Sequence, residues 1–179
     1  MTKLDAGKFI LKPITIDLID DRYLNWMNDN EVTQWLDSNQ TEKRDINYLK
    51  KYVQSFDNTN DYLFGIYHEN KLIGTHAFRY NTKLKSASLG TMIGDKDYWG
   101  KGVPLITRSA ILDWSFNKFD LDEVWGGAQS KNFPSIYNFK RQGFTVKKII
   151  ENHRIVNDIN KDFIIFVMTK DKWCESRTS

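Results

Sequence analysis

The chain has 179 residues, 27% of them charged, and a formal net charge of +3, so it is neither a disordered chain nor a strongly basic nucleic-acid-binding protein. Its one cysteine, Cys174, can form neither an internal disulfide nor a thiolate metal site. No apolar run suits a signal peptide or a membrane span, so we expect a soluble, cytoplasmic single domain over residues 1–179, with its core at about 8–170.

Residue patterns in the first half predict an edge strand, two helices and a three-stranded meander. Pro13 favours an edge position for the strand FILKPI. Thr41 is a candidate N-cap for the second helix, which keeps an apolar face. Glu69 and Asn70 form the turn of a hairpin. The ranges are 9–14 for the strand, 17–30 and 41–56 for the helices, and 62–68, 71–80 and 86–93 for the meander.

The second half predicts alternating helices and strands. The last helix is capped by Ser130, tolerates Pro134 in its first turn, and ends at Gly143 in a left-handed conformation. The predicted order β-α-α-β-β-β-α-β-α-β-β describes one α/β domain with a mixed (α+β) sheet. The ranges are 104–118 and 132–142 for the helices, and 122–129, 144–152 and 162–170 for the strands.

The loop GTMIGDKDYWGKGVP (90–104) joins a predicted strand to a helix through three glycines. Backbone amides at such a helix start, together with the positive end of its dipole, form an anion site. Five residues separate Gly94 from Gly100, which is the wrong spacing for a P-loop. Leu105 stands where a dinucleotide-binding loop needs its third glycine. A phosphate site outside those two motifs and a glycine-rich turn without a ligand both stay open on these residues alone.

The segment DYWGKGV resembles the x-x-x-G-x-G/A pyrophosphate loop of the GNAT superfamily of N-acetyltransferases. SKNFPSIYNFKRQGF (130–144) is similar to that superfamily's second motif, N-x-x-S followed by a helix ending in Gly-Phe. YLNWMNDNEVTQWL (23–36) and LFGIY…NKLIG (63–74) also match, the former resembling the branch that holds ribosomal-protein N-terminal acetyltransferases and sugar-modifying enzymes. The four segments cover nearly the whole chain in the expected order.

The resemblance implies acetyl-CoA as the donor, with no metal, and a central sheet splayed beside the glycine loop. The pantetheine arm would lie along the strand end, the pyrophosphate in the loop, and the thioester end near the last helix. Asn132 and Ser135 have plain helix capping as the alternative role. The implied cofactor-binding residues are Met92, Ile93, Gly94, Tyr98, Trp99, Gly100, Lys101, Gly102, Val103, Asn132 and Ser135.

The catalytic groups depart from the superfamily's pattern. Phe139 stands where many members carry a general-acid tyrosine, and Ser88 where many carry a glutamate base. Ser135 is the candidate acid or thiolate partner, and His76 the candidate base, with a structural role or a solvent-mediated proton path as the alternatives. Predicted acceptor-binding residues are Asp29 and Glu31, with Trp26 and Trp35 as apolar walls; the alternative places them in the core and rim of two helices.

The resemblance therefore predicts transfer of an acetyl group to a primary amine by a monomer or homodimer. The favoured acceptor is a small molecule, an amino sugar or a nucleotide-linked amino sugar. The alternatives are the N-terminal amine of a ribosomal protein and, in another class, a non-catalytic acyl-CoA-binding module. Nucleic acid and membrane insertion are not expected.

Overall fold

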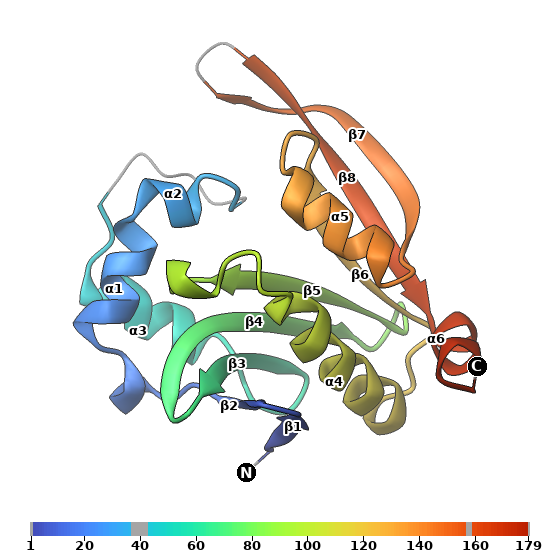
Figure 1. Cartoon of the computed structure of the whole chain (residues 1–179), viewed down its shortest axis with the longest axis horizontal. Helices are drawn as coiled ribbons and strands as arrows, with labels where there is room; N and C mark the ends of the chain where they lie inside the picture. Colours follow the sequence, from blue (N-terminus) through green and yellow to red (C-terminus); the bar gives the residue numbers. More distant parts are fainter. Residues whose placement is uncertain (1, 37–42, 157–158, 179) are drawn as a thin grey trace.

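The computed structural model describes residues 2–36, 43–156 and 159–178. Within them, eight strands form one sheet in the order β1-β2-β3-β4-β5-β6-β8-β7 (Figure 1). Neighbouring strands are antiparallel except β5 and β6, which are parallel. The strands are β1 (Leu4–Ala6), β2 (Phe9–Pro13), β3 (Asp61–His68), β4 (Lys71–Asn81), β5 (Ser86–Ile93), β6 (Glu123–Gln129), β7 (Thr145–Val156) and β8 (Ile159–Thr169).

Helices cover both faces of the sheet. One apolar cluster joins the sheet to α4, α5 and α6, and a second cluster joins its other face to α1 and α3. Alternation along β3 produces the two clusters, because Phe64 and Ile66 face the first and Leu63 and Tyr67 face the second. The α-helices are α1 (Asp21–Asn28), α2 (Asn30–Thr33), α3 (Ile46–Gln54), α4 (Val103–Lys118), α5 (Phe133–Arg141) and α6 (Lys170–Thr178), with 3-10 turns at Ile16–Leu18 and Lys96–Tyr98.

The predicted α/β class with a mixed sheet is confirmed, and the meander matches closely. The turn residues Glu69 and Asn70 have φ of 48° and 65°, which suits a tight hairpin. The predicted edge position of the strand that ends at Pro13 is wrong, because β2 lies between β1 and β3. Pairing with β1 stops at Leu11, so Pro13 itself has a partner residue only in β3.

The predicted helix over 17–30 is wrong in its continuity, because two aspartates divide it. The Asp20 carboxylate accepts a hydrogen bond from the Tyr23 N–H at 3.0 Å and starts α1. The Asp29 carboxylate accepts one from the Glu31 N–H at 2.9 Å and starts α2 after α1 has ended. Asp side chains compete with the helix backbone in this way.

Other boundaries also differ. The proposed cap Thr41 lies outside the described residues, and Asp45 caps α3 instead. Asn132, not Ser130, caps α5. Strand β1 and helix α6 were not predicted; α6 is held by Trp173, which is buried and donates its indole N–H to the Asp113 carboxylate on α4 at 2.9 Å. These elements depend on tertiary contacts that local patterns do not carry.

Candidate active site

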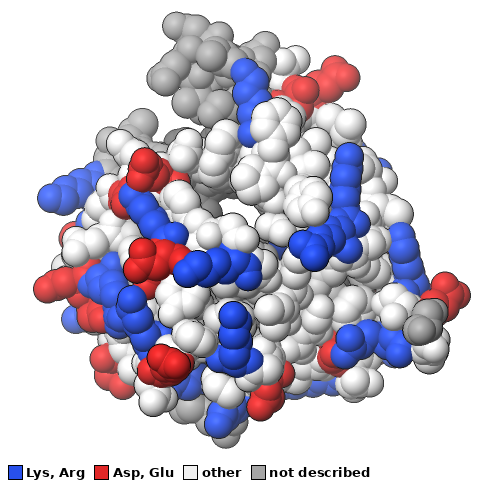
Figure 2. Space-filling model, in the orientation of Figure 1, with Lys and Arg blue, Asp and Glu red and all other residues white. Residues whose placement is uncertain are grey.

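The sheet opens between β5 and β6. Only residues 86–88 of β5 pair with residues 123–125 of β6, and beyond them the two strands separate. Figure 1 shows β5 diverging from the part of the sheet formed by β6, β8 and β7, with α4 and α5 on either side of the opening. Figure 2, in the same orientation, shows a hollow near the middle of the face in view, with Lys and Arg side chains beside it. The splayed sheet implied by the resemblance is therefore present.

The glycine loop ends beside this opening, at the start of α4. Gly100 and Gly102 have φ of 73° and 71°, a conformation that favours glycine. The N–H groups of Gly100, Gly102 and Val103 have no hydrogen-bond partner among the described residues. Three free amides at the start of a 16-residue helix form a nest that fits a pyrophosphate. Lys101 is exposed beside them and adds a positive charge.

Gly94 is required for a different reason. A Cβ atom on Gly94 would lie 2.1 Å from Cδ2 of Trp26, so the indole of Trp26 rests directly on this backbone. Trp26 is only 8% exposed and belongs to the second core cluster. The structure thus places Trp26 in the core rather than as an open wall of an acceptor site.

Side chains fix the loop to the strand end. The Trp99 indole N–H donates to the Ile93 carbonyl at 2.8 Å, and the Tyr98 hydroxyl contacts His68 Nδ1 at 2.9 Å. The Ile93 carbonyl is therefore already bonded, and Met92 has its side chain in the core, 8% exposed. Beyond residue 88, β6 leaves one side of the β5 backbone unpaired. This free backbone edge is what a pantetheine arm could pair with.

The acidic pair predicted to bind the acceptor is held by a lysine. Lys96 Nζ lies 2.7 Å from the Asp29 carboxylate and also contacts that of Glu31. This ammonium holds the pKa of Asp29 below its ordinary value. Both carboxylates thus contact Lys96, which belongs to the glycine loop, and Trp35 is half-buried after α2. The pair joins α2 to the loop and does not present two free negative charges.

Asn132 and Ser135 stand at the start of α5. The Asn132 carboxamide oxygen accepts from the Ser135 N–H at 3.2 Å, which is the capping role. Its amide N–H groups, and the Ser135 hydroxyl, have no hydrogen-bond partner among the described residues. Capping and ligand binding are compatible here, and Ser135 stays a prediction as a catalytic residue.

His76 is not placed as a general base. It is fully buried, with Nε2 2.8 Å from the Thr107 hydroxyl on α4 and Nδ1 3.0 Å from that of Thr91. Burial, reinforced by the charge of Arg108, lowers its pKa to about 3. A neutral imidazole enclosed by two threonines ties α4 to the sheet and is not exposed at the surface of the protein.

The opposite face of the same junction carries a row of side chains that sequence reasoning missed. Pairing in register aligns Asp61, Arg79, Ser88 and Trp125 across β3, β4, β5 and β6. They line a pocket of about 550 Å³, together with Tyr80, Asn81, Thr82, Lys83, Leu84 and Ser86. Ser88 and Trp125 are the last pair before the strands separate, so this pocket and the opening meet at one point of the sheet.

Arg79 is immobilised in this row. Its guanidinium lies 2.5 Å from the Asp61 carboxylate, donates to the Ser55 hydroxyl at 3.0 Å and stacks on the Phe56 ring. The one carboxylate of the pocket is thereby neutralised. Lys83 makes no ion pair among the described residues.

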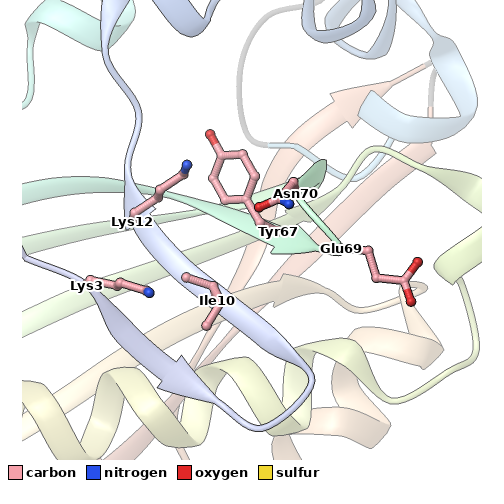
Figure 3. A pocket seen from close by; sticks show the side chains of 6 residues that line it. All are labelled: Lys3, Ile10, Lys12, Tyr67, Glu69 and Asn70. Atoms are coloured by element: carbon pink, nitrogen blue, oxygen red, sulfur yellow. The ribbon is translucent and has the colours of Figure 1, made fainter.

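A second pocket of about 240 Å³ lies at the β2–β3 edge and includes none of the predicted site residues (Figure 3). Figure 3 shows the Glu69 carboxylate directed away from the two lysines. Its lining residues are Lys3, Ile10, Lys12, Tyr67, Glu69 and Asn70. In the described ranges, no cluster of His, Cys, Asp and Glu is arranged to hold a metal ion, and no helix there has the length and apolar character to span a bilayer.

Comparison with known families decides the class. Residues 8–145 match the model of the acetyltransferase (GNAT) domain. The chain belongs to the GNAT acetyltransferase family. No curated protein matches the chain. This acetyltransferase uses acetyl-CoA as its donor, and the free amides at Gly100, Gly102 and Val103 are the part of its structure that fits the donor's pyrophosphate.

Solved structures show the same fold at low sequence identity. A RimL ribosomal L7/L12 α-N-protein acetyltransferase in complex with coenzyme A superposes with a TM-score of 0.84 at 16% identity, covering 96% of this chain and 99% of that one. A Salmonella typhimurium acetyltransferase that modifies the N-terminal serine of L7/L12 gives 0.81 at 16%, covering 94% and 99%. Spermidine N-acetyltransferase from Vibrio cholerae, with CoA and spermine, gives 0.80 at 16%, covering 93% and 98%. These likenesses establish the fold, and they leave the acceptor of this acetyltransferase to its own site.

Proposed function

We propose that this acetyltransferase transfers the acetyl group to the primary amine of an amino sugar, with the sugar bound in the pocket lined by Ser88 and Trp125. The supporting observation is the composition of that pocket, which combines an aromatic ring with hydroxyl and amide groups from Ser86, Ser88, Asn81 and Thr82. An aromatic face and a few placed polar groups suit a ring that carries hydroxyls.

Charge argues against a polycationic acceptor. The pocket's one carboxylate, Asp61, is paired with Arg79, while Asp29 and Glu31 are engaged by Lys96. A polyamine or a basic peptide in this pocket would lie near the cations Arg79 and Lys83, with no unpaired carboxylate in the pocket to bind it. Lys83 instead suits a phosphate, so a nucleotide-linked amino sugar fits better than the free sugar.

The residues divide the work between two faces of the sheet. The glycine loop and the start of α4 hold the donor, which supplies the thioester carbonyl, while the row from Asp61 to Trp125 orients the acceptor on the other face. The acceptor amine must reach the point where β5 and β6 separate, beside Ser88. Because Ser88 is a poor base, we expect the amine to lose its proton to solvent, and turnover to rise with pH as the amine becomes neutral.

An acceptor screen with the purified protein tests this proposal. Thiol release from acetyl-CoA would be measured with nucleotide-linked amino sugars, free amino sugars, spermidine and a peptide with an N-terminal serine. We expect turnover with the amino sugars, fastest for the nucleotide-linked form. Turnover of the peptide or spermidine alone would contradict the proposal, and CoA binding without turnover of any amine would favour a non-catalytic module.

The same assay with Trp125→Ala locates the acceptor. Losing the aromatic wall should raise KM for the amino sugar about tenfold, equivalent to about 1.4 kcal/mol, and leave the affinity for CoA unchanged. Tyr137→Ala is the matched control, since Tyr137 is a 61% exposed aromatic on α5 outside the pocket. Equal KM values for both variants would place the acceptor elsewhere.

A further inference from the structure

Arg108 carries a buried charge that the fold does not neutralise. It lies on α4, one turn beyond the glycine loop, and is 2% exposed. Within the described parts of the chain it belongs to no ion pair. Its Nη1 donates to the Gln142 carboxamide oxygen at 3.1 Å, and its Nε has no hydrogen-bond partner. A buried guanidinium with five donors ordinarily finds more than this.

Three stacked groups define where the guanidinium lies. The ring of Phe139 is parallel to that of Phe166, with centroids 4.8 Å apart, and the Arg108 guanidinium is 4.2 Å from the Phe139 centroid. A second stack on Phe139 must use the ring face that Phe166 leaves free. Phe166 belongs to β8, on the far side of β6 from β5. Arg108 therefore lies on the side of Phe139 that faces β5.

Phe139 in turn marks the point where the strands separate. A Cβ on Gly126 would lie 2.7 Å from Cζ of Phe139 and 2.9 Å from the Leu89 carbonyl oxygen. Gly126 and Leu89 are the first residues after the paired segment of β6 and β5. The guanidinium is thus placed over the inner end of the opening, on the face of α4 and α5. The charge also reaches β4, since it contributes to the lowered pKa of His76.

This arrangement costs stability. Burial without a carboxylate lowers the pKa of Arg108 to about 9, which still leaves the side chain charged at neutral pH. An apolar side chain of similar length would fill the same space without the desolvation penalty. A costly buried charge beside a candidate site is a candidate functional group.

We infer that Arg108 stabilises the thiolate that leaves during acetyl transfer, in the place where many GNAT members use a tyrosine and this chain has Phe139. The inference rests on the donor site described above, and does not depend on which amine is the acceptor. The backbone from Leu89, at the inner end of the opening, to Gly94 spans about 16 Å, five steps of about 3.3 Å each. This distance is comparable to an extended pantetheine arm, so an arm that starts at the glycine loop ends beside Arg108.

The step balances without a protein acid. The amine nitrogen attacks the thioester carbonyl carbon, the C–N bond forms, and the C–S bond breaks with its electron pair remaining on sulfur. The nitrogen loses its proton to water, and the sulfur later takes one from water. Phe139 has no proton to give, so the negative charge on sulfur must be stabilised where it forms, and a fixed cation in a dry site does this efficiently.

The acidity of the CoA thiol in the binary complex tests the inference separately from turnover. The thiolate is the reactive form in thiol–disulfide exchange, so the pH dependence of the reaction of bound CoA with a disulfide reagent gives the thiol pKa. We expect the wild-type protein to lower that pKa relative to free CoA. Arg108→Met should raise it by about one unit or more, a tenfold loss of thiolate, while Arg108→Lys keeps most of the effect.

Measuring the melting temperature of Arg108→Met, together with a control variant, distinguishes a catalytic role for Arg108 from a structural one. Arg108→Met should have a melting temperature equal to or above that of the wild type, with a kcat lowered at least about tenfold. Lys118→Met is the matched control, since Lys118 also stacks on aromatic rings but lies at the far end of α4. An unchanged thiol pKa in Arg108→Met, or the same shift in Lys118→Met, would overturn the inference. Should Arg108→Met fail to fold, a wild-type thiol pKa equal to that of free CoA would overturn it as well.

Discussion

The two faces of the β5–β6 junction are built by different means. On the donor face, the candidate anion site consists of backbone amides at Gly100, Gly102 and Val103, shaped by two left-handed glycines. On the opposite face, where we propose that the acceptor binds, side chains from four strands form a row that only strand pairing brings together. A backbone site accepts the same ligand group in any member of a family, whereas a side-chain row can change its substrate by single substitutions. The donor is therefore the shared property of the family, and the acceptor is the individual one.

The largest expected effect concerns the donor face. Gly102→Val forces a β-branched residue into φ of 71° and crowds the approach to the free amides, so it should weaken CoA binding about a hundredfold. This corresponds to about 3 kcal/mol, the loss of two hydrogen bonds to a charged ligand. Calorimetric titration with CoA measures it.

Gly7→Val is the matched control for that variant. Gly7 has φ of 66° and nothing within 4 Å of an added Cβ, but it lies in the turn between β1 and β2. The backbone penalty should be similar, and CoA affinity should stay at the wild-type value. If Gly102→Val bound CoA normally, or Gly7→Val lost it equally, the loop would not be the pyrophosphate site.

A smaller effect tests the assignment of His76 to the core of the donor face. Its pKa of about 3 in the folded protein lies below the ordinary value of 6.5, so the folded state binds fewer protons than the unfolded chain. The stability that His76 contributes is complete above pH 6.5 and is lost as the pH falls toward 3. From pH 7 to pH 5 the free energy of unfolding should fall by about 2 kcal/mol through this group.

Urea unfolding at the two pH values, with His76→Gln as the reference, isolates that contribution. Gln keeps a polar side chain between the two threonines but does not titrate. Equal losses for the wild type and the variant would show that His76 is accessible and titrates normally, which would return it to consideration as a base.

The conformation of the glycine loop was predictable because it depends on local backbone chemistry, while its anion-binding role stays a prediction. Three glycines and a proline at fixed spacing between a strand and a helix indicate an anion site, although Gly94 serves the packing of Trp26 instead. The pocket that we propose for the acceptor was not predictable in the same way. Asp61, Arg79 and Trp125 become neighbours of Ser88 only through the register of four strands.

Burial could not be predicted for two of the candidate site residues. His76 and Trp26 are residue types that suit an active site, and alternation along a strand or helix cannot distinguish a cleft from a core on the same face. Arg108 is the opposite case, because nothing in the helix sequence indicates that its charge would be buried without a carboxylate. Its significance appears only once α5 and β6 are packed against α4.

Amide hydrogen exchange, measured by mass spectrometry with CoA and then with a nucleotide-linked amino sugar, separates the two faces in one experiment. Without ligand, the unbonded amides of Gly100, Gly102 and Val103 should exchange fast. CoA should slow exchange over 89–93 and 98–103 and leave 79–86 unchanged, and the amino sugar should then protect 79–86 and the segment around Trp125. Protection by CoA over 79–86, or none at 98–103, would contradict a donor and an acceptor bound on opposite faces of the junction.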